Sequence, residues 1–305
     1  MSSEHFPTVL VTGSPGMLGR AVCEILRPAT SVVGISKRGL EGSVACDLSD
    51  AASVRRIFEK HLFQLVINTA AYSDVDGCER DPKQAYDSNA LAPKILSELC
   101  SEKKIPWIHV STDYVFNGKK ETPYVESDQA APVNVYGMTK WVGEYYAMTS
   151  LSPAAVVRTS WIFGAHQPNN FVNAVMERIK KESVISVLDD QTDAPTSAKD
   201  LSLALKKIAD YLLDFVRRNP GKTWNELFHV CNEGAATRYT MAVRLRDLMG
   251  RPEVRVEKTS RELITNRVAI RPGNAVMSSE RFQKFFGMRL RPWQESLADY
   301  VKEKS

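Results

Sequence analysis

The 305-residue sequence predicts an α/β fold, a doubly wound parallel sheet joined to a smaller C-terminal substrate-binding lobe. Three observations lead to this fold class. Short runs rich in β-branched residues alternate with longer amphipathic stretches through the first half, as is typical of right-handed βαβ units. A glycine-rich turn directly follows the first run, and the alternation loosens after about Gly164.

Strands are expected where short apolar runs are bounded by Gly, Asp, Asn or Ser. These runs are 8–13, 31–36, 64–70, 107–112, 154–163 and 226–232. Because most of them are apolar on both faces, they suit a parallel sheet covered by helices on both sides.

Helical periodicity predicts the connections and much of the second half. The expected helices are 16–26, 50–61, 81–104, 132–148, 169–181, 198–219, 238–250 and a last one from near Trp293. Ser49 or Asp50 and Asp81 are candidate N-caps, and Pro82 suits a first helical turn. Short strands and turns are expected between Arg251 and Arg291.

The domain boundaries follow from this pattern. We expect a dinucleotide-binding domain over 1–165, to which a segment of about 188–232 returns. The substrate-binding lobe is then expected to comprise 166–187 and 233–305.

Composition excludes several classes of protein. No apolar run approaches the roughly 20 residues that span a bilayer, and the N-terminus lacks the features of a secretory signal, so we expect a cytoplasmic protein. The five cysteines and five histidines show neither C-x-x-C nor H-E-x-x-H spacing, which predicts buried free thiols and no protein-built metal site. A net charge of +4 spread along the chain indicates no nucleic-acid or membrane partner.

The turn "VLVTGSPGMLGRA" predicts a dinucleotide site of the Rossmann type. Gly13, Gly16 and Gly19 lie between the first strand and the first helix. Glycines there permit a tight turn and let the backbone approach a pyrophosphate at the helix N-terminus. Met17 and Leu18 belong to the same turn.

The second strand ends in Ser36, Lys37 and Arg38 rather than in an acidic residue. A hydroxyl and two cations attract a ribose 2′-phosphate, so NADPH is favoured and NADH stays an alternative. Further candidate cofactor contacts follow the next segments. They are Asp47, Leu48, Ala70, Ala71 and Tyr72.

A hydroxyl–tyrosine–lysine group is the candidate catalytic centre. Thr112 ends a strand, and Tyr136 and Lys140 lie four residues apart in "VNVYGMTKWVGE", hence on one face of a helix. A nearby ammonium lowers the pKa of a tyrosine, so Lys140 is expected to lower that of Tyr136. The pair Tyr300 and Lys304 repeats the spacing; no candidate hydroxyl meets it, and a frayed helix end with a solvated lysine is expected.

Segments in order along nearly the whole chain carry a resemblance. They include "VTGSPGMLGRAV", "STDYVFNG", "PVNVYGMTKWVGE", "VVRTSWIFG" and "RPGNAVMSSERF". The chain thereby resembles the extended short-chain dehydrogenases/reductases, and within them the dTDP-4-dehydrorhamnose reductase family.

The resemblance implies that a hydride passes from the nicotinamide to the C4 ketone of a nucleotide-linked 4-keto-6-deoxyhexose. In that case Tyr136 donates the proton, Lys140 orients the cofactor, and Thr112 adjusts the proton transfer. Asp113 and Trp161 line the sugar site, although a core tryptophan is the alternative for Trp161. Arg271 is either a bidentate donor to the diphosphate or part of a surface salt bridge.

Three points depart from the resemblance or stay open. Asp193 stands where the family has a glycine; aspartate tolerates left-handed backbone better than most residues, and the conformation of that loop stays open. Family members may carry a metal ion at a subunit contact, but no ligand cluster in this sequence supports one. A homodimer also stays open, because an interface helix and a core helix share one periodicity.

Two alternative functions are weighed against the reductase. A related sugar-nucleotide epimerase shares the Tyr–Lys chemistry, while a dehydratase would need an acidic residue where Tyr114 stands. A non-catalytic NADP-binding subunit resembling the regulatory subunit of methionine adenosyltransferase also retains a Tyr-x-x-x-Lys. The "RTSW" segment with Trp161 favours a working sugar site over that regulator.

Overall fold

The computed structural model describes residues 6–165, 170–259 and 267–304. A parallel seven-stranded sheet forms its centre, in the order β11-β6-β5-β4-β1-β2-β3. The strands are β1 (Thr8–Thr12), β2 (Ser31–Ser36), β3 (Val44–Ala45), β4 (Leu65–Asn68), β5 (Trp107–Thr112), β6 (Ala154–Thr159) and β11 (Asn225–His229). The doubly wound parallel sheet expected from the sequence is confirmed.

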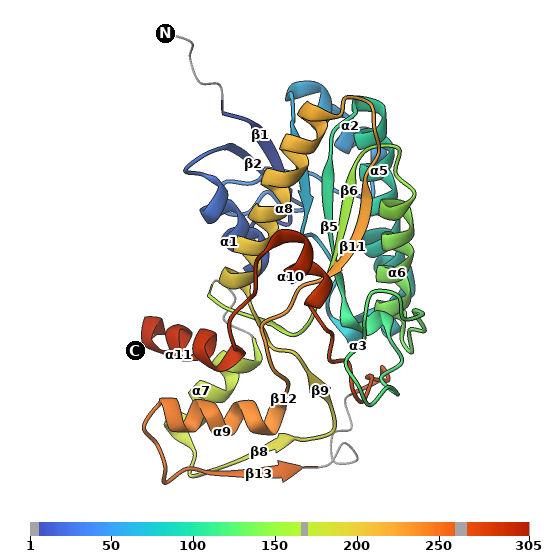
Figure 1. Cartoon of the computed structure of the whole chain (residues 1–305). Coiled ribbons are helices and arrows are strands. Elements are labelled where there is room, and N and C mark those ends of the chain that lie inside the picture. Colours follow the sequence, from blue (N-terminus) through green and yellow to red (C-terminus); the bar gives the residue numbers. More distant parts are fainter. Residues whose placement is uncertain (1–5, 166–169, 260–266, 305) are drawn as a thin grey trace.

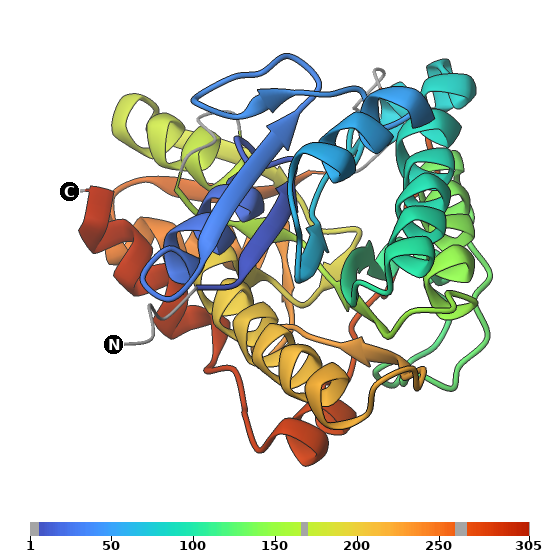
Figure 2. The same cartoon turned by 90° about the horizontal axis from the view of Figure 1, so that it is seen from above.

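Helices cover both faces of this sheet (Figures 1 and 2). One face carries α1 (Met17–Leu26) and α8 (Ala198–Arg218); the other carries α2 (Ala51–Lys60), α5 (Ala92–Lys103) and α6 (Val135–Met148). Successive strand residues point to opposite faces, so Val9 and Val11 enter one core while Leu10 enters the other. This explains why the strands read as continuous apolar runs.

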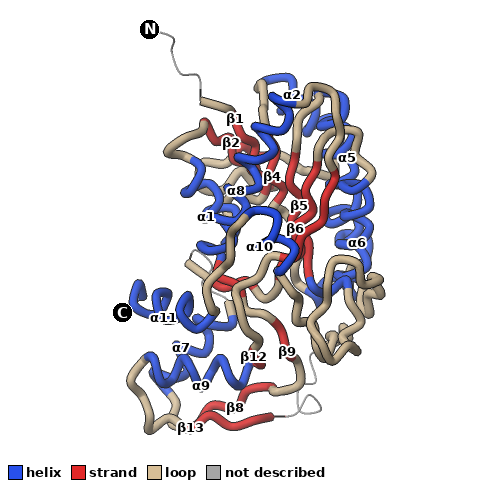
Figure 3. Tube along the Cα trace, viewed as in Figure 1, coloured by secondary structure: helices blue, strands red, loops and turns tan. Residues whose placement is uncertain are grey.

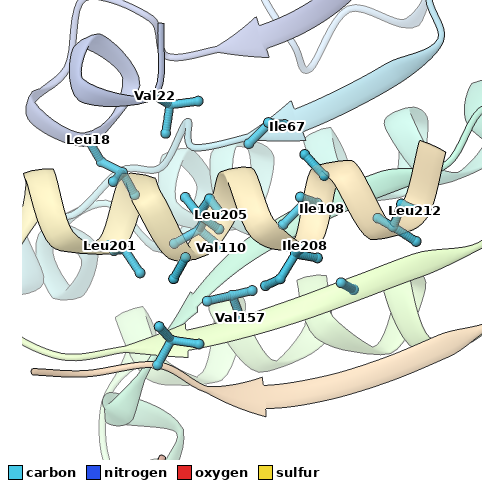
Figure 4. Close-up of a cluster of buried hydrophobic side chains, with 14 of the residues drawn as sticks. Leu18, Val22, Ile67, Ile108, Val110, Val157, Leu201, Leu205, Ile208 and Leu212 are labelled. Carbon is cyan, nitrogen blue, oxygen red and sulfur yellow. The ribbon is translucent and has the colours of Figure 1, made fainter. Parts of the chain in front are cut away.

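Figure 4 shows how the long helix α8 fits its core. Leu201, Leu205, Ile208 and Leu212 recur at helical spacing along one side and are fully buried. They face strand side chains such as Ile108 and Val157, and α1 adds Leu18 and Val22 (Figure 4). The segment after residue 188 therefore returns to the sheet through α8 and β11.

A smaller lobe lies beyond the carboxyl ends of the strands (Figure 3). There β8 (Val184–Leu188) pairs in parallel with β13 (Arg255–Thr259), beside α7 (Phe171–Lys181), α9 (Arg238–Leu248) and α11 (Trp293–Lys304). These elements share a separate apolar core. Two short pairs join the lobe to the sheet region: β7 (Ile162–Phe163) with β10 (Thr196–Ser197), and β9 (Thr192–Asp193) with β12 (Ala236–Thr237).

Several elements differ from the expectation. The helix expected over 81–104 is divided into α4 (Pro82–Tyr86), a π-helical turn η1 (Asp87–Leu91) and α5. The strand expected over 154–163 breaks at Trp161, whose φ of 39° lies in the left-handed region. The segment between Arg251 and Arg291 contains a helix, α10 (Glu280–Phe286), and its Phe282 and Phe286 belong to the main core rather than to the lobe.

Local signals at helix ends were more reliable. Asp50 caps α2 by accepting from the Ala52 amide, and Asp81 caps α4 with Pro82 in its first turn. All five cysteines are free and buried, as expected. Within the described ranges, no helix is both long enough and apolar enough to cross a bilayer.

Candidate active site

The candidate residues gather where the parallel strands end. The carboxyl ends of β1, β2, β4, β5 and β6 share one edge of the sheet, and the strand order reverses between β1 and β4. Open α/β sheets bind ligands outside this edge, at the point of reversal. The short 3-10 turn η2 (Asp113–Val115) follows β5, and a helix α3 (Val75–Arg80) follows β4.

The glycine turn after β1 leaves space that any side chain would fill. Gly13 has a φ of 64°, and a Cβ added there would lie 2.8 Å from the Ala70 Cα. A Cβ on Gly19 would lie 2.2 Å from the Gly13 carbonyl oxygen. Gly16 is the N-cap of α1 and offers no side-chain hydrogen bond, and the first turn holds no acidic residue. The first amides of α1 are therefore suited to an anion.

Met17 and Leu18 begin α1 with buried side chains. Leu18 packs in the main core (Figure 4), whereas Met17 lines a cavity together with Gly164 and Ser197.

A ladder of buried polar groups links the ends of β1, β4 and β5. The Thr12 hydroxyl donates to Asn68 Oδ1 at 2.6 Å, and Asn68 Nδ2 lies 2.9 Å from His109 Nδ1. The Ala70 amide donates to the Thr12 hydroxyl. These contacts fix the backbone at Ala70 and Ala71, where sequence analysis places cofactor contacts.

Tyr72 is held by a residue that sequence analysis missed. Asn89 accepts from the Tyr72 amide at 2.9 Å and donates to the Tyr72 carbonyl at 3.0 Å. It lies fully buried in the π-helical turn η1. Such turns occur often at functional sites; in the sequence, this one is hidden inside a continuous helical pattern.

At the end of β2, the expected cations have different surroundings. Lys37 forms an ion pair with Asp47 at 2.8 Å, which lowers the Asp47 pKa to about 2. Asp47 also accepts from the amide and hydroxyl of Ser49. Ser36 contacts the Ser43 hydroxyl, whereas Arg38 is exposed. Lys37 would therefore have to leave Asp47 to meet a 2′-phosphate. Leu48 is partly buried against the second core.

Tyr136 and Thr112 meet at the end of β5. Tyr136 is in the first turn of α6, and its hydroxyl is hydrogen-bonded to the Thr112 side chain. The ring stands edge-on to Tyr114, with centroids 5.7 Å apart. Burial raises the pKa of Tyr136 above its ordinary value, so the lowered pKa expected from the sequence is wrong for this arrangement.

Lys140 explains that difference. Its side chain is 2% exposed, and Nζ donates to the Val110 carbonyl at 2.6 Å. Burial lowers the pKa of Lys140 to about 8, although nearby Glu144 opposes that shift. The lysine is thus one turn from Tyr136 on α6, as predicted, with its charge directed to the backbone of β5.

Asp113 lies in a network of buried acids. It accepts from Thr112 at 2.9 Å and from Ser160 at 2.8 Å, and it is hydrogen-bonded to Asp193. Burial and the mutual repulsion of the two carboxyls raise the pKa of Asp113, and burial raises that of Asp193 to about 6. Two adjacent buried acids cannot both ionise cheaply, so this pair shares a proton.

Asp193, the residue that replaces the family's glycine, is part of a short strand. It lies in β9, paired with Ala236 of β12, and it is 4% exposed. Gln191 donates to its carboxylate and also contacts the Tyr114 hydroxyl, in each case from Nε2. Sequence analysis noted the substitution but gave no sign of the contact with Asp113.

Trp161 is partly buried between the sheet and the lobe. Its ring is 5.5 Å from that of Phe171, and the guanidinium of Arg238 lies 5.3 Å from its centroid. A positive φ is rare for a bulky residue, and such strain is found at functional sites. Among the residues that the structure describes, none is a hydrogen-bond partner of the buried Nε of Arg238, and sequence analysis missed this cation.

Arg271 already has an acidic partner. Its two terminal nitrogens donate to the two carboxylate oxygens of Asp76 on α3, each at 2.7 Å. The pair holds the pKa of Asp76 below its usual range. The geometry is bidentate, as it would be toward a phosphate, but in this structure Asp76 takes the place of such a ligand.

A metal site has no support in these ranges. Among residues 6–165, 170–259 and 267–304, no group of three or more His, Cys, Asp or Glu side chains is placed to hold an ion.

Comparison with known proteins identifies relatives over the whole length. Residues 7–305 match the family described as "RmlD substrate binding domain". A dTDP-4-dehydrorhamnose reductase of Mycolicibacterium smegmatis is 34% identical over 96% of this chain and 84% of that protein.

Solved structures agree. A dTDP-4-dehydrorhamnose reductase from Clostridium acetobutylicum has a TM-score of 0.85 at 30% identity, over 97% of this chain and 98% of that one. The enzyme of that name from Bacillus anthracis, in complex with NADP, has a TM-score of 0.87 at 26% identity, over 98% and 99%.

Proposed function

The chain belongs to the RmlD substrate-binding domain family of extended short-chain dehydrogenases/reductases, and on that basis we propose that it reduces a nucleotide-linked 4-keto-6-deoxyhexose. It is an NAD(P)H-dependent oxidoreductase of the dTDP-4-dehydrorhamnose reductase type. The observation that carries the proposal is the hydrogen bond between Tyr136 and Thr112, with Lys140 one helical turn from Tyr136, at the sheet edge that also carries the glycine turn.

The dinucleotide fits the first part of this site. The uncapped amides of α1 and the space kept by Gly13 and Gly19 suit its pyrophosphate. NADPH, when bound, supplies the hydride that reduces C4. NADPH is the favoured form and NADH is an alternative: Ser36 and Arg38 are assigned to the 2′-phosphate, together with Lys37 once it leaves Asp47.

Within the chain, Tyr136 is the proposed proton donor. Its raised pKa keeps the phenol protonated near neutrality, which is the form needed to protonate the oxygen at C4. Thr112 positions that hydroxyl and supplies a second hydrogen bond to the oxygen. Lys140, held at Val110, is assigned to the cofactor ribose.

The sugar is assigned to the boundary between sheet and lobe. Trp161 covers its apolar face, and Asp113 faces it beside Thr112. Arg271 is proposed to exchange Asp76 for the diphosphate. Under this proposal, residues 1–165 with 188–232 bind the dinucleotide, and the remaining segments serve the substrate.

Reduction is favoured over the alternative functions. The relatives named above are reductases, and Tyr114 hydrogen-bonds Gln191 where a dehydratase would need an acid. A regulator without activity would not need the strained Trp161 beside Arg238.

We test the function by following NADPH oxidation with dTDP-4-keto-6-deoxymannose, generated in place by coupling enzymes. Turnover with NADPH exceeding that with NADH is the expected result. Cofactor binding without turnover would instead support the regulator. Parallel assays with UDP- and GDP-linked analogues identify the nucleotide.

We also propose a homodimer. Tyr86, Met138, Trp141 and Tyr145 on α4 and α6 are between 41% and 63% exposed. Tyr86 is hydrogen-bonded to Tyr146, whose ring contacts that of Tyr145, so this apolar surface is continuous. A second copy would cover it; light scattering should give a dimer mass for wild type and a monomer mass for Trp141→Glu.

A further inference from the structure

A buried carboxylate follows Lys140 by one helical turn. Glu144 is 3% exposed and Lys140 is 2% exposed, both on the inner face of α6. Neighbouring residues of β5 bind the two side chains. Val110 accepts from Lys140 at 2.6 Å, and Ser111 donates to Glu144 at 2.5 Å. The strand therefore fixes both charges side by side.

Arg158 of β6 holds Glu144 from the other direction. Its Nε and Nη2 donate to the two carboxylate oxygens at 2.8 and 2.7 Å. The guanidinium lies 5.0 Å from the Phe116 ring centroid and 3.4 Å, through Nη1, from His229 Nε2. With Ser111, this gives Glu144 three donors, which fix the orientation of the buried carboxylate.

We propose that Glu144, held by Arg158 and Ser111, is a positioning residue that keeps Lys140 charged at its place one turn from Tyr136. This inference rests on the proposed function, because it assigns Glu144 a part in the same reaction. A lone ammonium in a low-dielectric interior tends to lose its proton. Glu144 is the neighbouring charge that opposes this loss at Lys140.

Other groups around Lys140 do not replace Glu144. From β5, His109 is neutral, since burial and the charge of Lys140 lower its pKa well below the usual value. From β6, Arg158 is already paired with Glu144.

The helical elements beside α6 also offer no replacement charge. On α3, burial raises the pKa of the Cys78 thiol to about 12, and Glu79 accepts from the Val135 amide at the start of α6. Asp113 of η2 acts on Tyr136, whose pKa it raises, and η1 presents the uncharged Asn89.

The test compares three variants with wild type. Glu144→Gln removes the charge and keeps the shape, Glu144→Asp keeps the charge, and Ser111→Ala removes one hydrogen bond to Glu144 without changing any charge. The readouts are kcat/KM against pH, and the affinity for NADPH against pH without substrate.

Losing Glu144 lowers the Lys140 pKa, so the ammonium is retained only at lower pH. The alkaline limb of both profiles should move down by roughly one pH unit or more in Glu144→Gln. At pH 8 the variant should lose several-fold more activity than at pH 6.5. Ser111→Ala should keep the alkaline limb at the wild-type pH even if its melting temperature falls. Glu144→Asp should have its alkaline limb close to that pH.

The inference is overturned if Glu144→Gln loses kcat/KM equally at every pH, or if its alkaline limb stays at the wild-type pH. Absence of turnover in wild type would reject the proposed function instead, while the NADPH profile still tests Glu144. Because an unpaired buried guanidinium destabilises a fold, Glu144→Gln/Arg158→Gln is the second variant. It removes both charges and should show the same displaced limb; full recovery of the wild-type profile would leave Glu144 with a purely structural role.

Discussion

Two tyrosine–lysine pairs share one spacing but lie in different surroundings. One is Tyr136 with Lys140 on α6, and the other is Tyr300 with Lys304 on α11. On α6 the lysine is buried against β5 and the tyrosine is partly exposed beside Thr112. On α11 the tyrosine is 5% exposed and donates to Asn173 at 2.6 Å, while the lysine is exposed above its ring. The α6 pair thus combines a partly exposed phenol with a buried cation, and α11 has the reverse arrangement.

The largest effect is expected from removing the buried cation. Lys140→Met should lower kcat/KM by on the order of a hundredfold or more, because an ammonium that orients cofactor and proton donor is lost. Lys304→Met, on the exposed pair, is the matched control and should stay within about twofold. Steady-state NADPH oxidation measures both; similar losses would remove the distinction between the pairs.

The next largest effect is expected on stability, from the buried acids Asp113 and Asp193 near Tyr136. The Asp193 pKa is raised to about 6 from 3.8, so the folded state holds this proton more tightly than the unfolded chain. That contribution to stability is complete below pH 3.8 and is lost as pH rises through about 6. Asp193→Asn should therefore gain about 1–3 kcal/mol relative to wild type at pH 8, and little at low pH.

Urea unfolding at pH 4 and pH 8 measures this difference. A variant destabilised equally at both values would show that Asp193 contributes packing and hydrogen bonds alone. The α11 pair provides the internal reference, since Tyr300→Phe should show no such dependence on pH between these values.

A smaller effect is expected at the far end of the cofactor site. Arg38→Ala should lower kcat/KM for NADPH by about tenfold, the size of one lost charge-assisted contact. The value for NADH should not change, since NADH lacks the 2′-phosphate. Equal losses with both cofactors would place Arg38 outside this contact.

The smallest effect concerns the second tyrosine. Tyr300→Phe removes one hydrogen bond to Asn173 and should cost about 0.5–1.5 kcal/mol of unfolding free energy. Thermal unfolding measures this cost, and the rate of NADPH oxidation per folded molecule should stay at the wild-type value. A loss of rate would give α11 a part in the reaction.

Much of this contrast could be predicted from sequence. Gly13, Thr112, Tyr136 and Lys140 follow strand ends or helix starts, and local pattern locates such positions well. The depth of Tyr300 could not be predicted, because its partner Asn173 is 127 positions away.

The site residues that the sequence did not reveal also depend on contacts beyond the local sequence pattern. Asp193 meets Asp113 only after β9 has formed, and Glu144 meets Arg158 through the packing of α6 on β6. Asn89 depends on a π-helical turn that helical periodicity does not reveal. The expected direction of the Tyr136 pKa was wrong for a similar reason: spacing suggested a nearby ammonium, whereas burial raises this pKa and Lys140 donates to Val110 instead.

The most direct test of the central claim is the turnover of Tyr136→Phe beside that of Tyr300→Phe, with NADPH affinity measured for each. Tyr136→Phe should lose about a hundredfold or more in kcat and keep its affinity for NADPH within a few-fold, while Tyr300→Phe keeps both. Turnover of Tyr136→Phe within a few-fold of wild type would contradict the assignment of the proton donor.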